Sequence, residues 1–447
     1  MLGDVKAAHS AAEEKLVAEF ARARGSLPGA APVGALRDAA FEAFKSAGLP
    51  TRRVEAWHYT DLRMAMRDAL PVAPAPKADA SLKQKLEKLA PRIADLETTR
   101  LVLVDGYFVA ELSDVTPKGV TVTALSEALA KGDAAFVEAL SAPGMGQGDA
   151  ALALNTAFMQ GGVIIDVAAG THVAQPIEMI ALSSEMSAHA VYARSLLRVG
   201  KGAQVTLIER EVSTASQIEQ RNHALVVSVA DEAQVEHVFV PAILKSASTY
   251  VASLLAILGA KASFNSFTLV QGGGLLRRQI HMRFDGEHAK GQLAGASVLR
   301  NKDHADTTLV VQHVAAHCQS REYFKTVLDG ESTGIYQGKV IVAPGAQKTD
   351  GAMKSHAILL SDDATMNNKP ELEIFADDVV CGHGATVAQL DEDQVFYAMA
   401  RGLPKPVAES MLLEAFVDEA TDRVESEPLR VYLTGLISQW LSHRGAA

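Results

Sequence analysis

The sequence predicts a mainly β protein in which a parallel β-helix stands between helical N-terminal and C-terminal regions. Through the middle of the chain, short β-branched runs alternate with tight turns that resemble one another, as residues 199–205 and 229–235 show. Ala203 and Ala233 are 30 residues apart, and Ala233 and Ala260 are 27 apart. A repeat of this length is typical of a solenoid, whose coils bury their apolar faces against their neighbours. No helix-length pattern interrupts the repeat, so tight turns should link the parallel strands.

The repeated turn is the main argument for a β-helix over its alternative. Further copies of the turn occur at residues 258–262, 284–289 and 342–347, with a weaker copy at 167–173. Evenly spaced short strands also describe a double-layered β-sandwich. We favour the β-helix because the turns repeat in sequence as well as in spacing.

Residues 1–100 are predicted to form the helical N-terminal region. Helices are expected at 7–24, 34–47 and 81–89. Gly48 and Pro50 should end the second helix, because glycine terminates helices readily and proline cannot continue them. An Ala/Pro-rich stretch near 71–76 cannot hold a regular helix and is predicted to be a linker.

Strand-like sequence begins at residue 101, so the β-helix core is placed at 101–389 and a C-terminal helical domain at 390–447. Three helices are expected in that domain, at 391–400, 406–421 and 428–441. Asp391 is a suitable N-cap for the first of them. The open end of a solenoid needs a cover, so these helices serve either as a cap or as a docking platform.

Composition excludes several classes of protein. The 447 residues carry a formal net charge of −11, which disfavours nucleic acid and an anionic membrane as partners. Two cysteines cannot form a disulfide framework. The longest apolar run, at 251–260, has about half of the roughly 20 residues that a spanning helix requires. Without a signal-peptide pattern at the N-terminus, the expected location is the cytoplasm.

No nucleotide-binding loop is present in the sequence. Such a loop needs Gly-x-x-x-x-Gly-Lys-Ser/Thr so that backbone N–H groups and the lysine hold the phosphates. The nearest approach, Gly338-Lys339, is followed by Val340 and has no glycine at the required earlier position. The protein is therefore not expected to be an ATPase itself.

Cys381 and His383 form the most informative motif. A strand alternates its side chains, so both residues should lie on the same face of a strand. A thiolate beside an imidazole suits zinc, iron or an iron–sulfur cluster. Two ligands are too few for a closed tetrahedral site. The site is therefore open, shared with another chain, or not a metal site, since a buried cysteine is also a common core residue.

A second cluster consists of His313, His317 and Cys318. The two histidines would share a helix face as metalloprotease ligands do, but Val314 stands where that motif needs glutamate. On a strand they would be roughly 13 Å apart, too far for one metal. The interpretation favoured here is structural, and the cluster receives no assigned role.

Paired carboxylates suggest a rival activity. Adjacent aspartates at 362–363 and 377–378 are compatible with a stand-alone β-helix enzyme that uses Asp377, Asp378 and His383 on a small molecule or glycan. Adjacent aspartates at turns are more often turn formers, and only 5% of the residues are aromatic, whereas glycan grooves are rich in aromatic side chains.

Longer stretches around Cys381 resemble the SufB/SufD family of the SUF iron–sulfur cluster assembly machinery, and within it the SufD branch. The similarity runs through residues 369–379, 381–387, 393–397 and 400–403, with upstream matches at His313, Cys318, Ser320, Lys325, 347–350 and 154–158, and with a further match at 55–60. The SufB branch carries an acidic–His pair where this chain has Cys381 and His383. Gly382 and Ala388 replace an expected serine and glycine, and neither change removes a ligand.

The resemblance implies a fold and a function. The expected fold is a right-handed β-helix, and the expected role is a non-catalytic scaffold with no permanently bound cofactor. Its β-helix would pair with a SufB-like paralogue, and its C-terminal helices would bind a SufC-like ATPase. Cys381 and His383 would hold transient iron or a nascent iron–sulfur cluster at the interface with the paralogue. Self-association of the isolated subunit through the same surface stays open, as do the stoichiometry and the cluster type.

Overall fold

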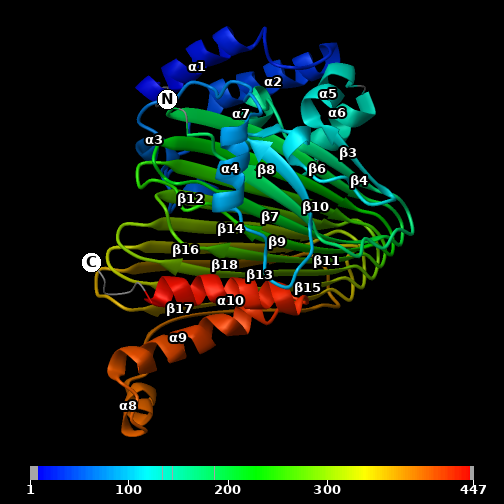
Figure 1. The fold of residues 1–447 in the computed structure, drawn as a ribbon. Helices are drawn as coiled ribbons and strands as arrows, with labels where there is room; N and C mark the ends of the chain where they lie inside the picture. The colour runs from blue at the N-terminus through cyan, green and yellow to red at the C-terminus, as the bar shows by residue number, and fades with distance from the viewer. Residues whose placement is uncertain (1–8, 133, 143, 186, 443–447) are drawn as a thin grey trace, which may run out of the picture.

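The computed structural model describes residues 9–132, 134–142, 144–185 and 187–442, and its centre is a two-sheet parallel β-helix of about eight turns. Figure 1 shows the coils stacked from the N-terminal helices down to the C-terminal ones. The ten-stranded sheet has the order β19-β17-β15-β13-β11-β9-β7-β5-β1-β2, and the nine-stranded sheet the order β18-β16-β14-β12-β10-β8-β6-β4-β3. The predicted fold class, a β-helix between two helical regions, is confirmed.

From β4 to β19, strands alternate between the two sheets along the chain, so each coil contributes one strand to each sheet. The ten-stranded sheet contains β1 (Thr99–Val104), β2 (Tyr107–Phe108), β5 (Ile177–Leu182), β7 (Gln204–Val212), β9 (Gln234–Val240), β11 (Ser263–Val270), β13 (Lys290–Leu299), β15 (Gln319–Leu328), β17 (Asp350–Leu359) and β19 (Val380–Gln389). The nine-stranded sheet contains β3 (Val120–Ala124), β4 (Val163–Val167), β6 (His189–Val199), β8 (Glu219–Val229), β10 (Thr249–Leu258), β12 (Leu275–Phe284), β14 (His304–His313), β16 (Thr333–Val342) and β18 (Thr365–Ile374). Apart from the β1–β2 and β3–β4 pairs, neighbouring strands run parallel.

The repeated turn has a clear structural cause. In successive coils one residue adopts a left-handed backbone conformation, with φ of 62° at Glu232, 57° at Lys261, 60° at His288 and 61° at His317. The next residue is small and buried in the core between the sheets: Ala233, Ala262, Ala289 and Cys318. Cys318 therefore occupies the alanine position of this turn.

The N-terminal helices pack on the nine-stranded sheet. They are α1 (Ala11–Ala23), α2 (Ala31–Ala47), the 3₁₀ turn η1 (Glu55–Trp57) and α3 (Leu62–Ala65). Helix α4 (Ala80–Leu89) is the exception, because it packs beside β1 and β5 of the ten-stranded sheet. Aromatic rings join α1 and α2 to the strands, with the Phe20 and Phe41 rings stacked at 3.9 Å and Phe158 stacked on Tyr192 at 4.8 Å. The predicted linker at 71–76 is irregular, and two backbone hydrogen bonds tie it to Ala190 of β6.

Three further helices lie within the stretch predicted as β-helix core. They are α5 (Leu125–Lys131), α6 (Ala134–Ser141) and α7 (Ala150–Phe158), and a second 3₁₀ turn, η2, covers Ala110–Leu112. Residues 154–158, which were predicted to lie within the β-helix core, are helical. The reason is local: the Asp149 side chain accepts a hydrogen bond from the N–H of Leu152 and caps an alanine-rich helix.

The C-terminal helices agree with the predicted ones to within a few residues. They are α8 (Glu392–Ala400), capped by Asp391 as expected, α9 (Lys405–Thr421) and α10 (Glu427–Ser442). The buried faces of α9 and α10 pack on the outer face of the ten-stranded sheet, whereas α8 projects beyond the last coil (Figure 1). In the described residues we find no helix with the length and hydrophobicity that a bilayer span requires.

Candidate functional site

Cys381 and His383 lie on β19, the last strand of the ten-stranded sheet. Parallel pairing places Cys381 opposite Gly351 of β17, and His383 opposite Met353. Met353 is buried between the two sheets, so this register directs both candidate ligands to the inner face of the terminal coil. The alternation expected from the sequence is therefore present.

The two side chains differ in their access to solvent. Cys381 is half-buried against the core, while His383 is exposed. A Cβ added to Gly351 would lie 3.5 Å from the sulfur of Cys381, an ordinary contact distance, so the thiol packs directly over this position. Burial raises the pKa of Cys381 above its ordinary value, and the nearby Asp350 and Glu322 act in the same direction. The thiol therefore keeps its proton at neutral pH unless a metal displaces it.

The donor set of this chain is incomplete for a metal. Among the described residues there is no group of three or more histidine, cysteine, aspartate or glutamate side chains able to hold a metal ion. Cys381 and His383 offer a soft sulfur and an imidazole nitrogen, which fit iron, zinc or an iron–sulfur cluster. The remaining ligands would have to come from another molecule.

The last coil presents a surface suited to such a molecule. In the described sheets β18 and β19 are both terminal, so each has one edge without a strand neighbour. Exposed apolar side chains gather on and between these two strands: Ile374 at 39%, Phe375 at 62%, Val380 at 74% and Val387 at 47% exposure. Unpaired strand edges beside apolar side chains are a template for another chain.

Polar groups lie inside the solenoid beneath the two candidate ligands. Ser320 precedes Gly351 and Cys381 in one ladder of paired positions, and Glu322 precedes Met353 and His383 in the next. Glu322 is 1% exposed, and neither of its carboxylate oxygens has a hydrogen-bond partner among the described residues. Burial raises its pKa to about 8, so the carboxyl is protonated at neutral pH.

His313, His317 and Cys318 do not converge. His313 is buried and its ring stacks on Phe284 at 4.5 Å, whereas His317 is exposed and stacks on His288 at 4.7 Å. The sulfur of Cys318 lies 3.3 Å from the carbonyl oxygen of Gly286. The pattern His317-Cys318 is thus one more copy of the solenoid turn.

The carboxylate pairs of the rival enzyme do not converge either. Asp378 is exposed and forms an ion pair with Lys348 of the preceding turn. Residues 362–363 lie in the turn between β17 and β18, and residues 377–378 in the turn between β18 and β19. A cavity of about 630 Å³ is lined chiefly by α2 and by 145–153, and none of Asp377, Asp378 and His383 borders it.

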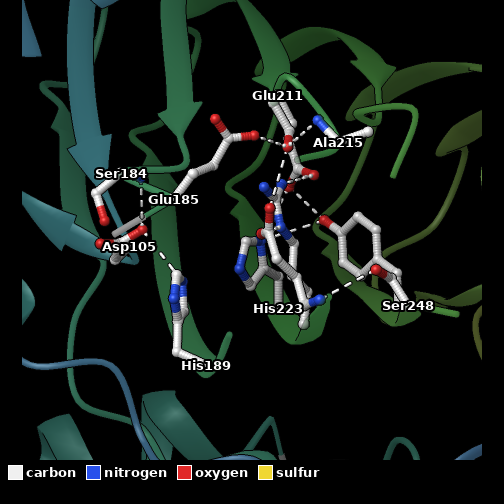
Figure 2. Close-up of polar contacts among 12 residues, drawn as sticks. Asp105, Ser184, Glu185, His189, Glu211, Ala215, His223 and Ser248 are labelled. Atoms are coloured by element: carbon white, nitrogen blue, oxygen red, sulfur yellow. Dashed lines mark hydrogen bonds and ion pairs between the residues drawn. The ribbon is translucent and has the colours of Figure 1, made fainter. Parts of the chain in front are cut away.

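One buried polar network was not predicted from the sequence. Figure 2 shows Glu211 beside His223, and Asp105 facing His189. Glu211 lies 2.9 Å from His223 and 3.2 Å from Arg221, and it also accepts a hydrogen bond from the hydroxyl of Tyr250. Burial alone would raise the pKa of Glu211, but His223 and Arg221 lower it to about 2.

Glu211, Arg221 and Tyr250 of this network are all buried. The ion pairs of the network satisfy the carboxylate of Glu211, so the network has the character of a structural element. The signal in the sequence is the placement of charged residues at alternate, inward-facing positions of apolar strands, as Glu209 and Glu211 are in β7. Charged residues on an apolar strand are unusual, so the sequence alone draws attention to them. Their hydrogen-bond and ion-pair partners lie on other strands, however, and cannot be identified from the sequence of one strand.

Comparison with known proteins places these features in context. Residues 181–416 match the core-domain model of SufBD proteins of the SUF system for iron–sulfur cluster assembly, and residues 11–179 match the SufBD N-terminal region. The iron–sulfur cluster assembly protein SufD of Escherichia coli is 29% identical over 397 residues, covering 88% of this chain and 90% of that protein. The SufBD family protein slr0076 of Synechocystis is 27% identical, covering 90% of each chain, and the chloroplastic protein ABCI7 of Arabidopsis thaliana is 25% identical, covering 89% and 84%.

Proposed function

Because this chain belongs to the SufBD family of the SUF iron–sulfur cluster assembly system, we propose that it is a cytoplasmic, non-catalytic scaffold subunit on which clusters are assembled. The observation that carries the proposal is the terminal coil. There a thiol and an imidazole share the inner face of the last strand, beside two unpaired strand edges. An incomplete ligand set at an uncovered edge suits a site that is completed by a partner and later releases its cargo.

The partner at this edge is a SufB-like paralogue that continues or faces β18 and β19. Four exposed apolar side chains on the last coil would be buried by such pairing. Gly382 and Gly384 have no atom within 4 Å of an added Cβ among the described residues, so another backbone can approach β19 closely. The same surface would allow two copies of the isolated subunit to pair when the paralogue is absent.

A SufC-like ATPase would bind the C-terminal helices. Helix α8 exposes Phe396 at 72%, Tyr397 at 61% and Met399 at 42%, and the first half of α9 exposes Met411 at 53%. Apolar side chains at this exposure, on helices that project from the body of the protein, are typical of a docking surface. A bound ATPase would also supply the nucleotide hydrolysis for which this chain has no phosphate-binding loop.

Iron and sulfide are substrates in this proposal. Cys381 would bind iron as the thiolate after losing its proton, and His383 would bind through a neutral ring nitrogen. The paralogue would supply the other ligands. The cluster is transient, so the protein holds no permanent cofactor.

The test is an anaerobic affinity purification of the tagged full-length chain from its native cells, with partners identified and bound iron and sulfide assayed. Recovery of an ATPase and a paralogous β-helix subunit, with iron and acid-labile sulfide, is expected. Cys381→Ala and His383→Ala should each retain both partners but lose most of the iron and sulfide.

His317→Ala is the matched control, because His317, like His383, is an exposed histidine within two residues of a cysteine, but it lies in a solenoid turn. This control should retain wild-type iron and sulfide. The proposal is refuted if the wild-type chain is recovered alone and without iron from cells that make both partners. Wild-type cluster content in His383→Ala would remove His383 from the ligand set.

A further inference from the structure

The cavity of about 630 Å³ lies away from the candidate metal ligands. It is lined by α2, by the end of α6, by residues 145–149, by α7 and by strands β6 and β10. The helices α2 and α7 lie at the opposite end of the solenoid from the C-terminal helices (Figure 1). Much of the lining is leucine and alanine: Leu36, Ala40, Leu140, Leu152, Ala153 and Leu255. Its size and apolar walls are those of a pocket for a small molecule.

A buried arginine borders this apolar cavity. Arg194 of β6 is 3% exposed, and its guanidinium group donates hydrogen bonds of 2.9 Å to the side-chain oxygens of Asn155 and Thr156 and to the carbonyl oxygen of Leu140. A guanidinium group carries five N–H donors, and these three bonds use one donor on each nitrogen. One N–H on Nη1 and one on Nη2 therefore have no hydrogen-bond partner among the described residues.

The charge of Arg194 is not balanced by a carboxylate in the described part of the chain. All three of its hydrogen-bond acceptors are neutral oxygens. Burial lowers the pKa of Arg194 to about 10, so the guanidinium group is still charged at neutral pH. A buried charge without a counter-ion is costly, and an anion that enters the cavity would remove that cost.

A second buried arginine adds to the positive charge. Arg37 of α2 is 1% exposed and donates hydrogen bonds to the carbonyl oxygens of Pro28 and Ala157, at 2.8 and 3.0 Å. Burial and the like charges of Arg24 and Arg194 lower the pKa of Arg37 to about 10. Its Nε–H has no hydrogen-bond partner among the described residues. Two buried guanidinium groups are thus close enough to repel each other, which favours an anion beside them.

The carboxylate of Asp149 borders the same cavity but is already engaged. One of its oxygens accepts a hydrogen bond from the indole N–H of Trp57, at 3.1 Å, and the other caps α7 by accepting from the N–H of Leu152, at 2.8 Å. Asp149 therefore does not neutralise Arg194. Its bond to Trp57 also places a fluorescent side chain next to the cavity lining.

We propose that this cavity binds a small amphiphilic carboxylate, such as a medium-chain fatty acid, with the carboxylate on Arg194 and the hydrocarbon chain along α2 and α7. A carboxylate can accept the unused N–H groups of Nη1 and Nη2 together, which is the preferred geometry for an arginine. The apolar walls suit a hydrocarbon chain. A neutral apolar molecule would leave the charge of Arg194 unbalanced, and a polyanion such as a nucleotide would meet mostly apolar walls. The proposal is independent of the proposed role in cluster assembly.

The first experiment is isothermal titration of the full-length chain with decanoate below its micelle-forming concentration. A single saturable site is expected. Decan-1-ol has the same chain without the charge, and acetate has the charge without the chain. Each should bind at least about tenfold more weakly than decanoate, because a hydrogen bond to a charged group contributes about that factor in affinity and the apolar chain contributes more.

A blocking variant tests the position of the site without touching Arg194. Ala43 borders the cavity from α2 and is exposed, so Ala43→Phe should fill the cavity and weaken decanoate binding at least about tenfold. Ala35→Phe is the matched control, because Ala35 is also an exposed alanine of α2 but does not border the cavity. This control should bind decanoate as the wild type does.

A charge variant tests the role of Arg194. Arg194→Met should reduce the affinity for decanoate to that for decan-1-ol. Arg198→Met is the control, because Arg198 is on the same strand but is exposed and pairs with Asp166. Thermal unfolding shows whether each variant is folded. If Arg194→Met does not fold, Ala43→Phe and the comparison of decanoate with decan-1-ol still decide the outcome.

Trp57 provides a second readout at the cavity itself. Decanoate should change the tryptophan emission of the wild type and of Ala35→Phe, but not that of Ala43→Phe. Equal affinities for decanoate and decan-1-ol would overturn the carboxylate specificity. Wild-type decanoate affinity in Ala43→Phe would show that binding occurs elsewhere. The absence of saturable decanoate binding in the wild type would refute the proposal altogether.

Discussion

Glu322 should make the protein less stable as the pH rises, and Glu322→Gln should remove that loss. The carboxyl is buried inside the solenoid on β15, in the same ladder as His383 of β19. Burial raises its pKa from an ordinary 4.5 to about 8. Below pH 4.5 it is protonated in both the folded and the unfolded chain. Between 4.5 and about 8 the unfolded chain releases the proton while the folded chain retains it, so the free energy of unfolding falls with pH.

The size of the effect follows from that interval. At about 1.4 kcal/mol for each pH unit, the interval from 4.5 to about 8 corresponds to about 5 kcal/mol. Glutamine has nearly the same shape as the protonated acid and does not ionise. Glu322→Gln should therefore match the wild type near pH 4.5 and exceed its stability by up to about 5 kcal/mol above pH 8.

The assay is urea unfolding of wild type and variant at several pH values between about 5 and 8.5, followed by circular dichroism. Glu331→Gln is the control: Glu331 is exposed at the surface, so its replacement should shift the midpoint little at any pH. If the difference between wild type and Glu322→Gln is the same at every pH, the carboxyl is already ionised or hydrogen-bonded and the reasoning is wrong.

Three further predictions concern buried groups. Burial lowers the pKa of His313 to about 4, so the wild type should lose about 3 kcal/mol as pH falls from 6.5 to 4, and His313→Leu should show no such loss in acid unfolding. Cys318→Ala should cost about 1 kcal/mol or less in urea and leave the iron and sulfide content of the complex unchanged, because alanine fills that turn position in other coils. Glu211→Gln should lower the free energy of unfolding by about 3 kcal/mol, since it removes a charged partner of buried Arg221. Thermal unfolding tests this, and an unchanged melting temperature would refute it.

Local patterns made much of the fold predictable. The turn repeat is visible in the sequence because each coil needs the same left-handed residue followed by a small buried one, as at Glu232 and Ala233. Asp391 marked the start of α8 because capping is a local interaction. Helix α7 was missed, since its alanine-rich apolar sequence is compatible with more than one buried structure.

The candidate site was predictable in part. Alternation along one strand placed Cys381 and His383 on one face without knowledge of their neighbours. Their position at the end of the solenoid, above Gly351 and Met353, required the strand order. The roles of His313 and Cys318 as buried residues became clear only with the coil register, because a sequence motif does not reveal which sheet position it occupies.

The sequence by itself determined the β-helix, its terminal helices and the pair of candidate ligands, because each of these is encoded by neighbours within one strand, turn or helix. Tertiary structure alone decided which coil is last, which edges are unpaired, and that Lys325 meets Glu419 across 94 residues of chain. It also decided that Glu322 is buried without a hydrogen-bond partner among the described residues. The physical reason is that burial and ion pairing depend on contacts between coils, and a solenoid brings together residues that lie about a full turn or more apart in the chain.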